Sequence, residues 1–135
     1  NNAKVLDVGT GSGYQAAILA GMAKSVYSIE IVPELAASAA ARLEELGYDN
    51  VQVRYGDGYR GWPDEAPFDG IIAAAAPDHI PQALVEQLAI GARLVIPVGD
   101  RSQTMTIVTK TENGSTIDTT FPVRFVPMTG DAKRP

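Results

Sequence analysis

The sequence predicts an α/β fold, in which a mostly parallel β-sheet packs between helices and ends in an antiparallel hairpin near the C-terminus. An apolar run at 5–8 leads directly into a turn of alternating glycines and then into a helical stretch. Further short apolar runs alternate with helical stretches up to residue 99, which is typical of parallel strands joined by helices. From Thr104 to Val126 polar and apolar residues alternate instead, which indicates antiparallel strands.

Length and composition indicate a single globular domain over residues 1–135. Of these residues 45% are hydrophobic and 20% are charged, which suits a chain with a hydrophobic core. No apolar run approaches the roughly 18 residues of a membrane-spanning helix, so we expect no membrane partner. The formal net charge of -5 argues against nucleic acid as a partner, because proteins that bind phosphate backbones usually carry a basic face.

Two residue types that are absent or rare exclude several kinds of site. The lack of cysteine removes disulfides and thiolate nucleophiles, and a single histidine removes most histidine triads and zinc sites. That histidine, His79, lies between two prolines and is interpreted as a surface or capping residue. We therefore predict no metal site, and we assign no catalytic side chain. A cytoplasmic location fits the lack of cysteine and of a signal peptide.

The first strand, turn and helix form one unit. Residues 5–8 predict a strand buried on both faces, with Asp7 as its one polar residue, placed at the cleft. Glycines at alternate positions allow positive φ and a close approach by a ligand. The helix expected from Tyr14 to about Lys24 points its free N–H groups at the same place. The second strand, Ser25–Glu30, ends in an acid.

The middle of the chain continues the alternation of helix and strand. Pro33 suits the first turn of a helix that runs through Leu46 and is closed by Gly47. Alternating side chains at 51–55 predict the third strand, and the turn Gly56-Asp57-Gly58 follows it.

The second half begins with a loop at 59–67 that is too irregular for a helix or a strand. The fourth strand is expected at Phe68–Ala76, a helix opens near Pro81, and the fifth strand is expected at Gly91–Gly99. Glu112-Asn113-Gly114 then predicts the turn of the C-terminal hairpin.

Two acids are placed to bind a nucleotide-like ligand. Glu30 follows the glycine turn by about 20 residues, where a carboxylate at the tip of the neighbouring strand accepts hydrogen bonds from both ribose hydroxyls. Asp57, between glycines at the end of the third strand, is placed to accept from an adenine amino group.

The glycine spacing bears on which nucleotide cofactor binds. The dinucleotide pattern G-x-G-x-x-G/A fails when counted from Gly9, because Tyr14 occupies its last position. Counted from Gly11, Ala16 completes the pattern but the first glycine lies beyond the strand end, so an NAD-binding oxidoreductase domain stays an alternative. The form D-x-G-x-G-x-G, which begins at Asp7, resembles the first motif of S-adenosylmethionine-dependent methyltransferases with a Rossmann-like fold.

Motifs in series along nearly the whole chain resemble those of the protein-L-isoaspartate O-methyltransferase family. The matching segments are Val5–Gln15, Gly56–Tyr59, Gly61-Trp62, Ala66–Asp69, Leu94–Gly99 and Val123–Met128. The resemblance implies a Rossmann-like class I methyltransferase fold, a three-layer sandwich. It also implies S-adenosyl-L-methionine as cofactor, with S-adenosyl-L-homocysteine as product. The implied partners are damaged proteins or peptides with L-isoaspartyl residues, whose α-carboxylate is methylated in protein repair.

The resemblance also implies roles for individual residues. The methionine part of the cofactor would be wrapped by Gly9, Thr10, Gly11 and Gly13, with Asp7 in support. The ribose hydroxyls would bind to Glu30, and the adenine would pack on Ile31. The adenine edge would be held by Asp57 and Gly58, and Thr129 would lie near the pocket. Arg134 stands where the family has a glutamine.

The end of the fourth strand faces the reacting methyl group in this fold. Residues 73–77 offer only backbone there, so no side chain is present to take a proton. A substrate that is already anionic needs none, and a free α-carboxyl group has a pKa of roughly 3.5.

One departure from the family lies upstream of the first motif. Family members carry an N-terminal region with an Ile-Ser-Gln-Pro-like segment beside the reacting carboxylate, and this sequence does not contain it. We therefore expect either a domain truncated at its N-terminus or a minimal core. An S-adenosylmethionine-binding core without catalytic activity is the main alternative function. A homodimer is expected if apolar surface is left bare.

Overall fold

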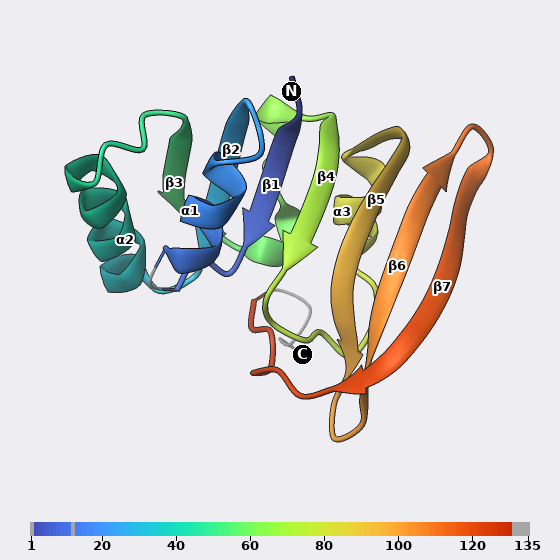
Figure 1. Cartoon of the computed structure of the whole chain (residues 1–135). Coiled ribbons are helices and arrows are strands. Elements are labelled where there is room, and N and C mark those ends of the chain that lie inside the picture. The colour runs from blue at the N-terminus through green and yellow to red at the C-terminus, as the bar shows by residue number, and fades with distance from the viewer. Residues whose placement is uncertain (1, 12, 131–135) are drawn as a thin grey trace.

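The computed structural model describes residues 2–11 and 13–130, which form a three-layer α/β sandwich around one sheet (Figure 1). The strand order is β3-β2-β1-β4-β5-β6-β7. Strands β1 to β5 pair in parallel, whereas β5 with β6 and β6 with β7 pair antiparallel. The predicted mostly parallel sheet with an antiparallel C-terminal hairpin is confirmed. Arg134, which stands where the family has a glutamine, lies outside the described residues.

The bounds of the elements, within the described residues, are as follows. The strands are β1 (Lys4–Val8), β2 (Ser25–Glu30), β3 (Val51–Tyr55), β4 (Phe68–Ala73), β5 (Leu88–Gly99), β6 (Gln103–Thr111) and β7 (Gly114–Val123). The α-helices are α1 (Tyr14–Ala20), α2 (Pro33–Glu45) and α3 (Gln82–Glu86). Two 3-10 helices, η1 (Gly58–Arg60) and η2 (Pro63–Glu65), lie in the stretch expected to be an irregular loop.

The first half of the chain follows the prediction closely. Strands β2 and β3 have the expected bounds, and Pro33 opens α2 as expected. Helix α1 ends at Ala20 rather than near Lys24. The reason is that the N–H groups of Lys24 and Ser25 already bond to the carbonyl of Ala3, as the chain turns into β2.

Two strand bounds in the second half differ from the prediction. Strand β4 ends at Ala73 rather than at Ala76, because the backbone of Ala76 pairs with the C-terminal segment instead of continuing the β4 ladder. Strand β5 begins at Leu88 rather than at Gly91, because Leu88 already pairs with Phe68.

Side chains that alternate along the strands supply two apolar cores, one on each face of the sheet. One face packs against α3 and η1, and its buried members include Leu6, Ile71, Leu84, Leu94 and Val108. The other face packs against α1 and α2, and its buried members are Ala16, Leu19, Val26 and Leu43. In the described part of the chain, no helix has the length and apolar character to cross a membrane.

The strand order places a ligand site at the centre of the sheet. Strands β1 and β4 are neighbours, and the chain leaves β1 toward β2 on one side and β4 toward β5 on the other. The connections after these two strands therefore diverge at their carboxyl ends. In open α/β sheets a ligand binds in the crevice that such a divergence creates.

Candidate functional site

A pocket of about 460 Å³ lies at the carboxyl ends of β1, β2 and β4. Five stretches of chain line it: Val8 with the glycine turn, residues 29–32 with Leu35, Gly58, the loop after β4, and residues 126–129. Six of the ten predicted site residues are in this lining, namely Gly9, Gly11, Glu30, Ile31, Gly58 and Thr129. The pocket is mainly apolar, and Glu30 is its one titratable side chain within the described residues.

The glycine turn is held in place by backbone hydrogen bonds to β2. The N–H groups of Gly9 and Thr10 donate to the carbonyl of Ile29 at 2.8 and 3.2 Å. Gly9 and Gly11 have φ of 92° and 55°, values that side chains disfavour, and a Cβ on Gly11 would contact nothing within 4 Å. Gly11 therefore presents bare backbone to the pocket. Gly13, with φ of 90°, is the N-cap of α1 and is buried beneath the turn, outside the lining.

Glu30 links the glycine turn to the start of α2. Its Oε1 accepts from the N–H of Gly11 at 2.8 Å and its Oε2 accepts from the N–H of Val32 at 3.1 Å. The residue is only 7% exposed. Each carboxylate oxygen can accept more than one hydrogen bond, so both retain capacity for hydroxyl groups in the pocket.

Asp7 lies beneath the glycine turn rather than at the cleft where the sequence placed it. Its carboxylate is fully buried and accepts from Gln15 Nε2 at 2.5 Å and from Ser28 Oγ at 2.7 Å. Ser28 Oγ lies 2.5 Å from Thr10 Oγ1, which is why Thr10 is also buried outside the pocket lining. The cause is the alternation of β1, in which the side chain of Val8 faces the pocket and that of Asp7 faces away from it. Burial raises the pKa of Asp7 to about 6.

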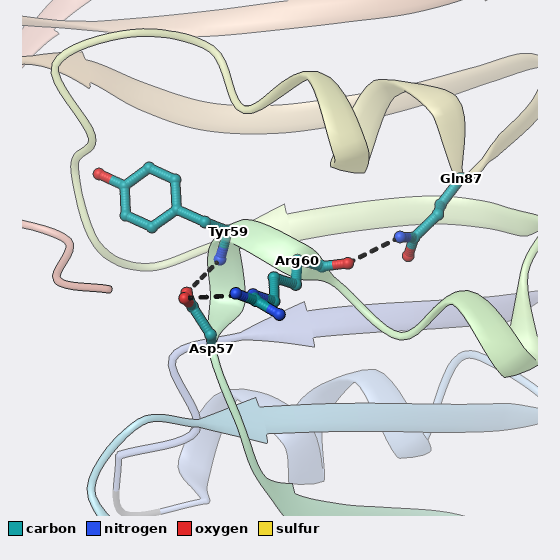
Figure 2. A network of polar contacts seen from close by, with 4 residues as sticks. All are labelled: Asp57, Tyr59, Arg60 and Gln87. Atoms are coloured by element: carbon teal, nitrogen blue, oxygen red, sulfur yellow. Dashed lines mark hydrogen bonds and ion pairs between the residues drawn. The ribbon is translucent and has the colours of Figure 1, made fainter. Parts of the chain in front are cut away.

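The carboxylate of Asp57 contacts residues of the turn that follows it (Figure 2). Its Oδ1 accepts from the N–H of Tyr59 at 2.9 Å, and its Oδ2 lies 3.9 Å from Arg60 Nε. The turn is fixed further by Gln87, which donates from Nε2 to the carbonyl of Arg60 at 2.8 Å. Asp57 is therefore not in the pocket lining, although Gly58 beside it is.

Gly58 lies where two walls of the pocket meet. A Cβ on this residue would lie 2.5 Å from Val8 Cγ1 and 3.0 Å from Met128 Cε, closer than side chains pack. A glycine here is needed for the close packing of η1 against β1 and the C-terminal segment.

The far wall of the pocket is Val126–Thr129, which we call the wall segment. It lies against the loop after β4 (Figure 1), where the N–H of Ala76 donates to the carbonyl of Val126 at 2.8 Å and the N–H of Met128 donates to the carbonyl of Ala76 at 2.8 Å. Sequence reasoning placed only Thr129 near the pocket. The apolar residues Val126-Pro127-Met128 were the available signal, because an apolar stretch after the last strand needs a surface to cover.

Sequence reasoning also missed Val32 and Leu35 in the lining, and Ser28 and Gln15 beneath it. It did place residues 73–77 at the site, and Ala74 and Ala75 are in the lining. A serine inside a buried strand beside a buried aspartate was the signal for Ser28.

His79 lies outside the pocket lining, on the surface, as interpreted from the sequence. Its Nδ1 lies 2.6 Å from Asp78 Oδ1, and its ring stacks on that of Tyr59 with the centroids 5.9 Å apart. Among the described residues no group of three acids or histidines is arranged to hold a metal ion.

Comparisons with known proteins identify a family whose match includes every residue of the pocket lining. Residues 1–133 match the family described as protein-L-isoaspartate(D-aspartate) O-methyltransferase. The chain is 60% identical over 129 residues to a protein-L-isoaspartate O-methyltransferase of Gloeobacter violaceus, covering 94% of this chain and 63% of that protein. It is 58% identical over 129 residues to a protein-L-isoaspartate O-methyltransferase 2 of Syntrophobacter fumaroxidans, covering 93% of this chain and 52% of that protein. The chain thus spans between about half and two thirds of the length of these relatives.

Solved structures agree with these relatives. A protein-L-isoaspartate O-methyltransferase superposes with a TM-score of 0.91 at 29% identity, covering 96% of this chain and 43% of that one. A Plasmodium falciparum protein assigned to the same activity, in complex with S-adenosyl-L-homocysteine, superposes with a TM-score of 0.76 at 28% identity, covering 94% of this chain and 66% of that one. The family match, the identity to these relatives and the shared fold together show that the chain belongs to the protein-L-isoaspartate(D-aspartate) O-methyltransferase family.

Proposed function

We propose that the chain binds S-adenosyl-L-methionine in the pocket at the ends of β1, β2 and β4 and directs its methyl group to the α-carboxylate of L-isoaspartyl residues in damaged proteins. The observation that carries the proposal is a pocket that combines bare glycine backbone with a buried acid, in a chain whose residues 1–133 match this family. The net charge of -5 supports a protein or peptide partner over nucleic acid.

The residues of the pocket fit an adenosyl cofactor. Glu30 has oxygen lone pairs left for two neighbouring hydroxyls, which suits a ribose. Ile31, Leu35 and Met128 offer apolar contact to an adenine ring, and the turn at Gly9–Gly11 leaves room for the methionine part. Asp57, held by η1, supports Gly58 at the adenine edge.

When bound, S-adenosylmethionine supplies a methyl group carried on a positively charged sulfur. The chain's own residues exclude water from the site and align the substrate, an effect worth several kcal/mol of barrier. The loop at Ala74 and Ala75 brings no titratable side chain to this end of the pocket. The acceptor must therefore be ionised without help from the protein, and an α-carboxylate with a pKa of roughly 3.5 meets that requirement.

Calorimetry and a transfer assay test the proposal together. We expect saturable binding of S-adenosylmethionine and S-adenosylhomocysteine, no binding of NAD, and transfer of a labelled methyl group to an isoaspartyl peptide but not to its normal aspartyl counterpart. Binding without transfer would favour the core that binds cofactor but lacks activity. Binding of NAD alone would overturn the proposal.

Variants of Glu30 and Gly11 test the site itself. Glu30→Ala removes the charged acceptor, and Gly11→Val forces a branched side chain into a left-handed backbone that faces the pocket. Each should weaken S-adenosylhomocysteine binding about tenfold or more. Glu45→Ala, at an exposed position of α2, is the matched control and should bind like the unaltered chain. Unaltered affinity in both site variants would refute the site.

The homodimer is proposed on exposed apolar surface. A groove of about 360 Å³ between α1 and α2 is bordered by Tyr14, Ile18 and Leu46, which are 75%, 47% and 65% exposed. A second copy that covers this groove would remove the three side chains from water. Sedimentation velocity over a range of concentrations should show a dimer that Leu46→Glu weakens, and a monomer at all concentrations would contradict it.

A further inference from the structure

We propose that Gln103 is a positioning residue for the pocket: its side-chain amide clamps the backbone of Phe125 and thereby sets the position of the wall segment, Val126–Thr129. The inference takes the proposed function as its basis, since it assumes that this pocket is the cofactor site. It adds a residue at the start of β6 that does not touch the pocket and acts on it through the chain's C-terminal segment.

The clamp consists of a pair of hydrogen bonds between one side chain and one backbone residue. Gln103 Oε1 accepts from the N–H of Phe125 at 2.6 Å, and Gln103 Nε2 donates to the carbonyl of Phe125 at 3.0 Å. This is the exchange that a residue of an adjacent strand makes with its partner, here performed by an amide side chain. Gln103 is only 6% exposed, so water does not compete well for these bonds.

The clamp lies where the regular ladder stops. The backbone of Gln103 pairs with Val123, the last residue of β7. Beyond Val123 the side chain of Gln103, instead of its backbone, makes the hydrogen bonds, and it fixes Phe125 immediately before the wall segment. From there the loop after β4 holds the chain through Ala76, and Tyr59 donates from its hydroxyl to the carbonyl of Met128 at 3.4 Å. The wall segment is thus held by hydrogen bonds at Gln103 just before it and at the loop after β4 along it.

The side chain of Gln103 is itself fixed by the tight turn between β5 and β6. Its Nε2 also donates to the carbonyl of Asp100 at 3.2 Å. Gly99, with φ of 135°, pairs with Gln103 across this turn. A glutamine meets all of these demands at once, because it carries a donor and an acceptor on one planar group.

The substitution Gln103→Glu tests the clamp with almost no change in shape. The carboxylate keeps an acceptor for the N–H of Phe125. Its second oxygen replaces the amide donor and repels the carbonyl oxygens of Phe125 and Asp100. We expect the dissociation constant of S-adenosylhomocysteine to rise about tenfold, the ratio that corresponds to loss of one hydrogen bond of typical net strength. Gln52→Glu, at an exposed position of β3, adds the same charge and should bind like the unaltered chain. Unchanged affinity in a folded Gln103→Glu variant would overturn the proposal.

Hydrogen exchange distinguishes positioning from a general loss of stability. In Gln103→Glu the amides of Phe125 and Met128 should exchange faster, whereas those of Gly9 and Thr10, which bond to Ile29, should not. Equal loss of protection at all four amides would mean that Gln103 only stabilises the fold, and would overturn the proposal.

The unaltered chain provides a measurement that needs no variant. Its Phe125 amide should be protected from exchange, and an amide that exchanges at the unprotected rate would show that the clamp does not form. If the unaltered chain binds no adenosyl cofactor but its Phe125 amide is protected, the proposed function fails while the clamp stands.

Discussion

At the scale of single residues, the burial of Asp7 makes the stability of the fold depend on pH. The carboxyl group is enclosed under the glycine turn, and desolvation raises its pKa from 3.8 to about 6. Between these values the folded chain holds a proton that the unfolded chain has lost, so the free energy of unfolding falls as pH rises through this window. The difference between the two pKa values corresponds to about 3 kcal/mol.

The variant Asp7→Asn should remove this dependence, because an amide does not titrate. Urea unfolding at pH 4 and at pH 7 measures the change for both proteins. The unaltered chain should lose about 2 kcal/mol more than the variant on going from pH 4 to pH 7, because part of the difference lies below pH 4. An identical pH dependence in the two proteins would show that Asp7 does not keep its proton in the folded state.

Gly58 gives a second prediction at this scale, since a methyl group there would collide with Val8 and Met128. Gly58→Ala should cost about 1 to 3 kcal/mol of stability and weaken cofactor binding, because the two walls must move apart. Gly70→Ala is the matched control. A Cβ at Gly70 has nothing within 4 Å and its φ is not in the left-handed region, so this change should not destabilise the fold. Thermal unfolding and calorimetry of the two variants compare them.

Which residues line the pocket could be predicted only in part from the sequence. Glu30, Gly9 and Gly11 were predictable because strand ends and φ requirements are local properties of the chain. Asp7 was misplaced because its direction depends on the register of one strand. In a strand a shift of one residue moves a side chain to the opposite face. Ser28 and Gln103 act through partners far away in the chain, at Asp7 and Phe125, which no local pattern specifies.

At the scale of elements, the hairpin of β6 and β7 contains two paired apolar residues whose truncation should destabilise the fold to different degrees. Val108 and Ile117 are cross-strand partners, but Val108 is 1% exposed and Ile117 is 56% exposed. Val108→Ala should cost about 2 kcal/mol of unfolding free energy, because it removes methyl groups from the core. Ile117→Ala should cost less than about 1 kcal/mol. Urea unfolding measures both, and a larger loss at Ile117 would contradict the exposure of β7.

The elements that sequence reasoning predicted well are those with a complete local signal. Ser25–Glu30 and Val51–Tyr55 were found with the observed bounds because apolar residues repeat within them and turns flank them. Phe68–Ala76 was overextended for a tertiary reason. Residues 74–76 are apolar enough for a strand, but Ala76 bonds to Val126 and Met128.

At the scale of the whole molecule, the pocket unites residues from both ends of the described chain. Binding of S-adenosylhomocysteine should therefore protect amides in two distant regions at once, at Gly11 and at Thr129. The hairpin turn at Glu112–Gly114 lies outside the lining and should exchange at the same rate with and without ligand. Hydrogen exchange followed by mass spectrometry tests this pattern, and protection confined to one region would mean that the wall segment does not close the site.

The alternation of strands and helices was enough to predict a parallel sheet with a site at the carboxyl ends of its strands. The sequence did not reveal that the stretch after β7 returns across the sheet to the loop after β4. That contact depends on backbone hydrogen bonds at Ala76, which any residue except proline can make, so no side chain marks it in advance.

The path of the wall segment has a consequence for how the protein is made. The glycine turn and Glu30 come before Val126–Thr129 in the chain and therefore leave the ribosome before them. A nascent chain stalled before Val126 would contain Glu30 and the glycine turn but would lack the wall segment on the other side of the pocket. Under the proposed function, an adenosyl ligand would therefore stabilise the chain only after the wall segment has been made.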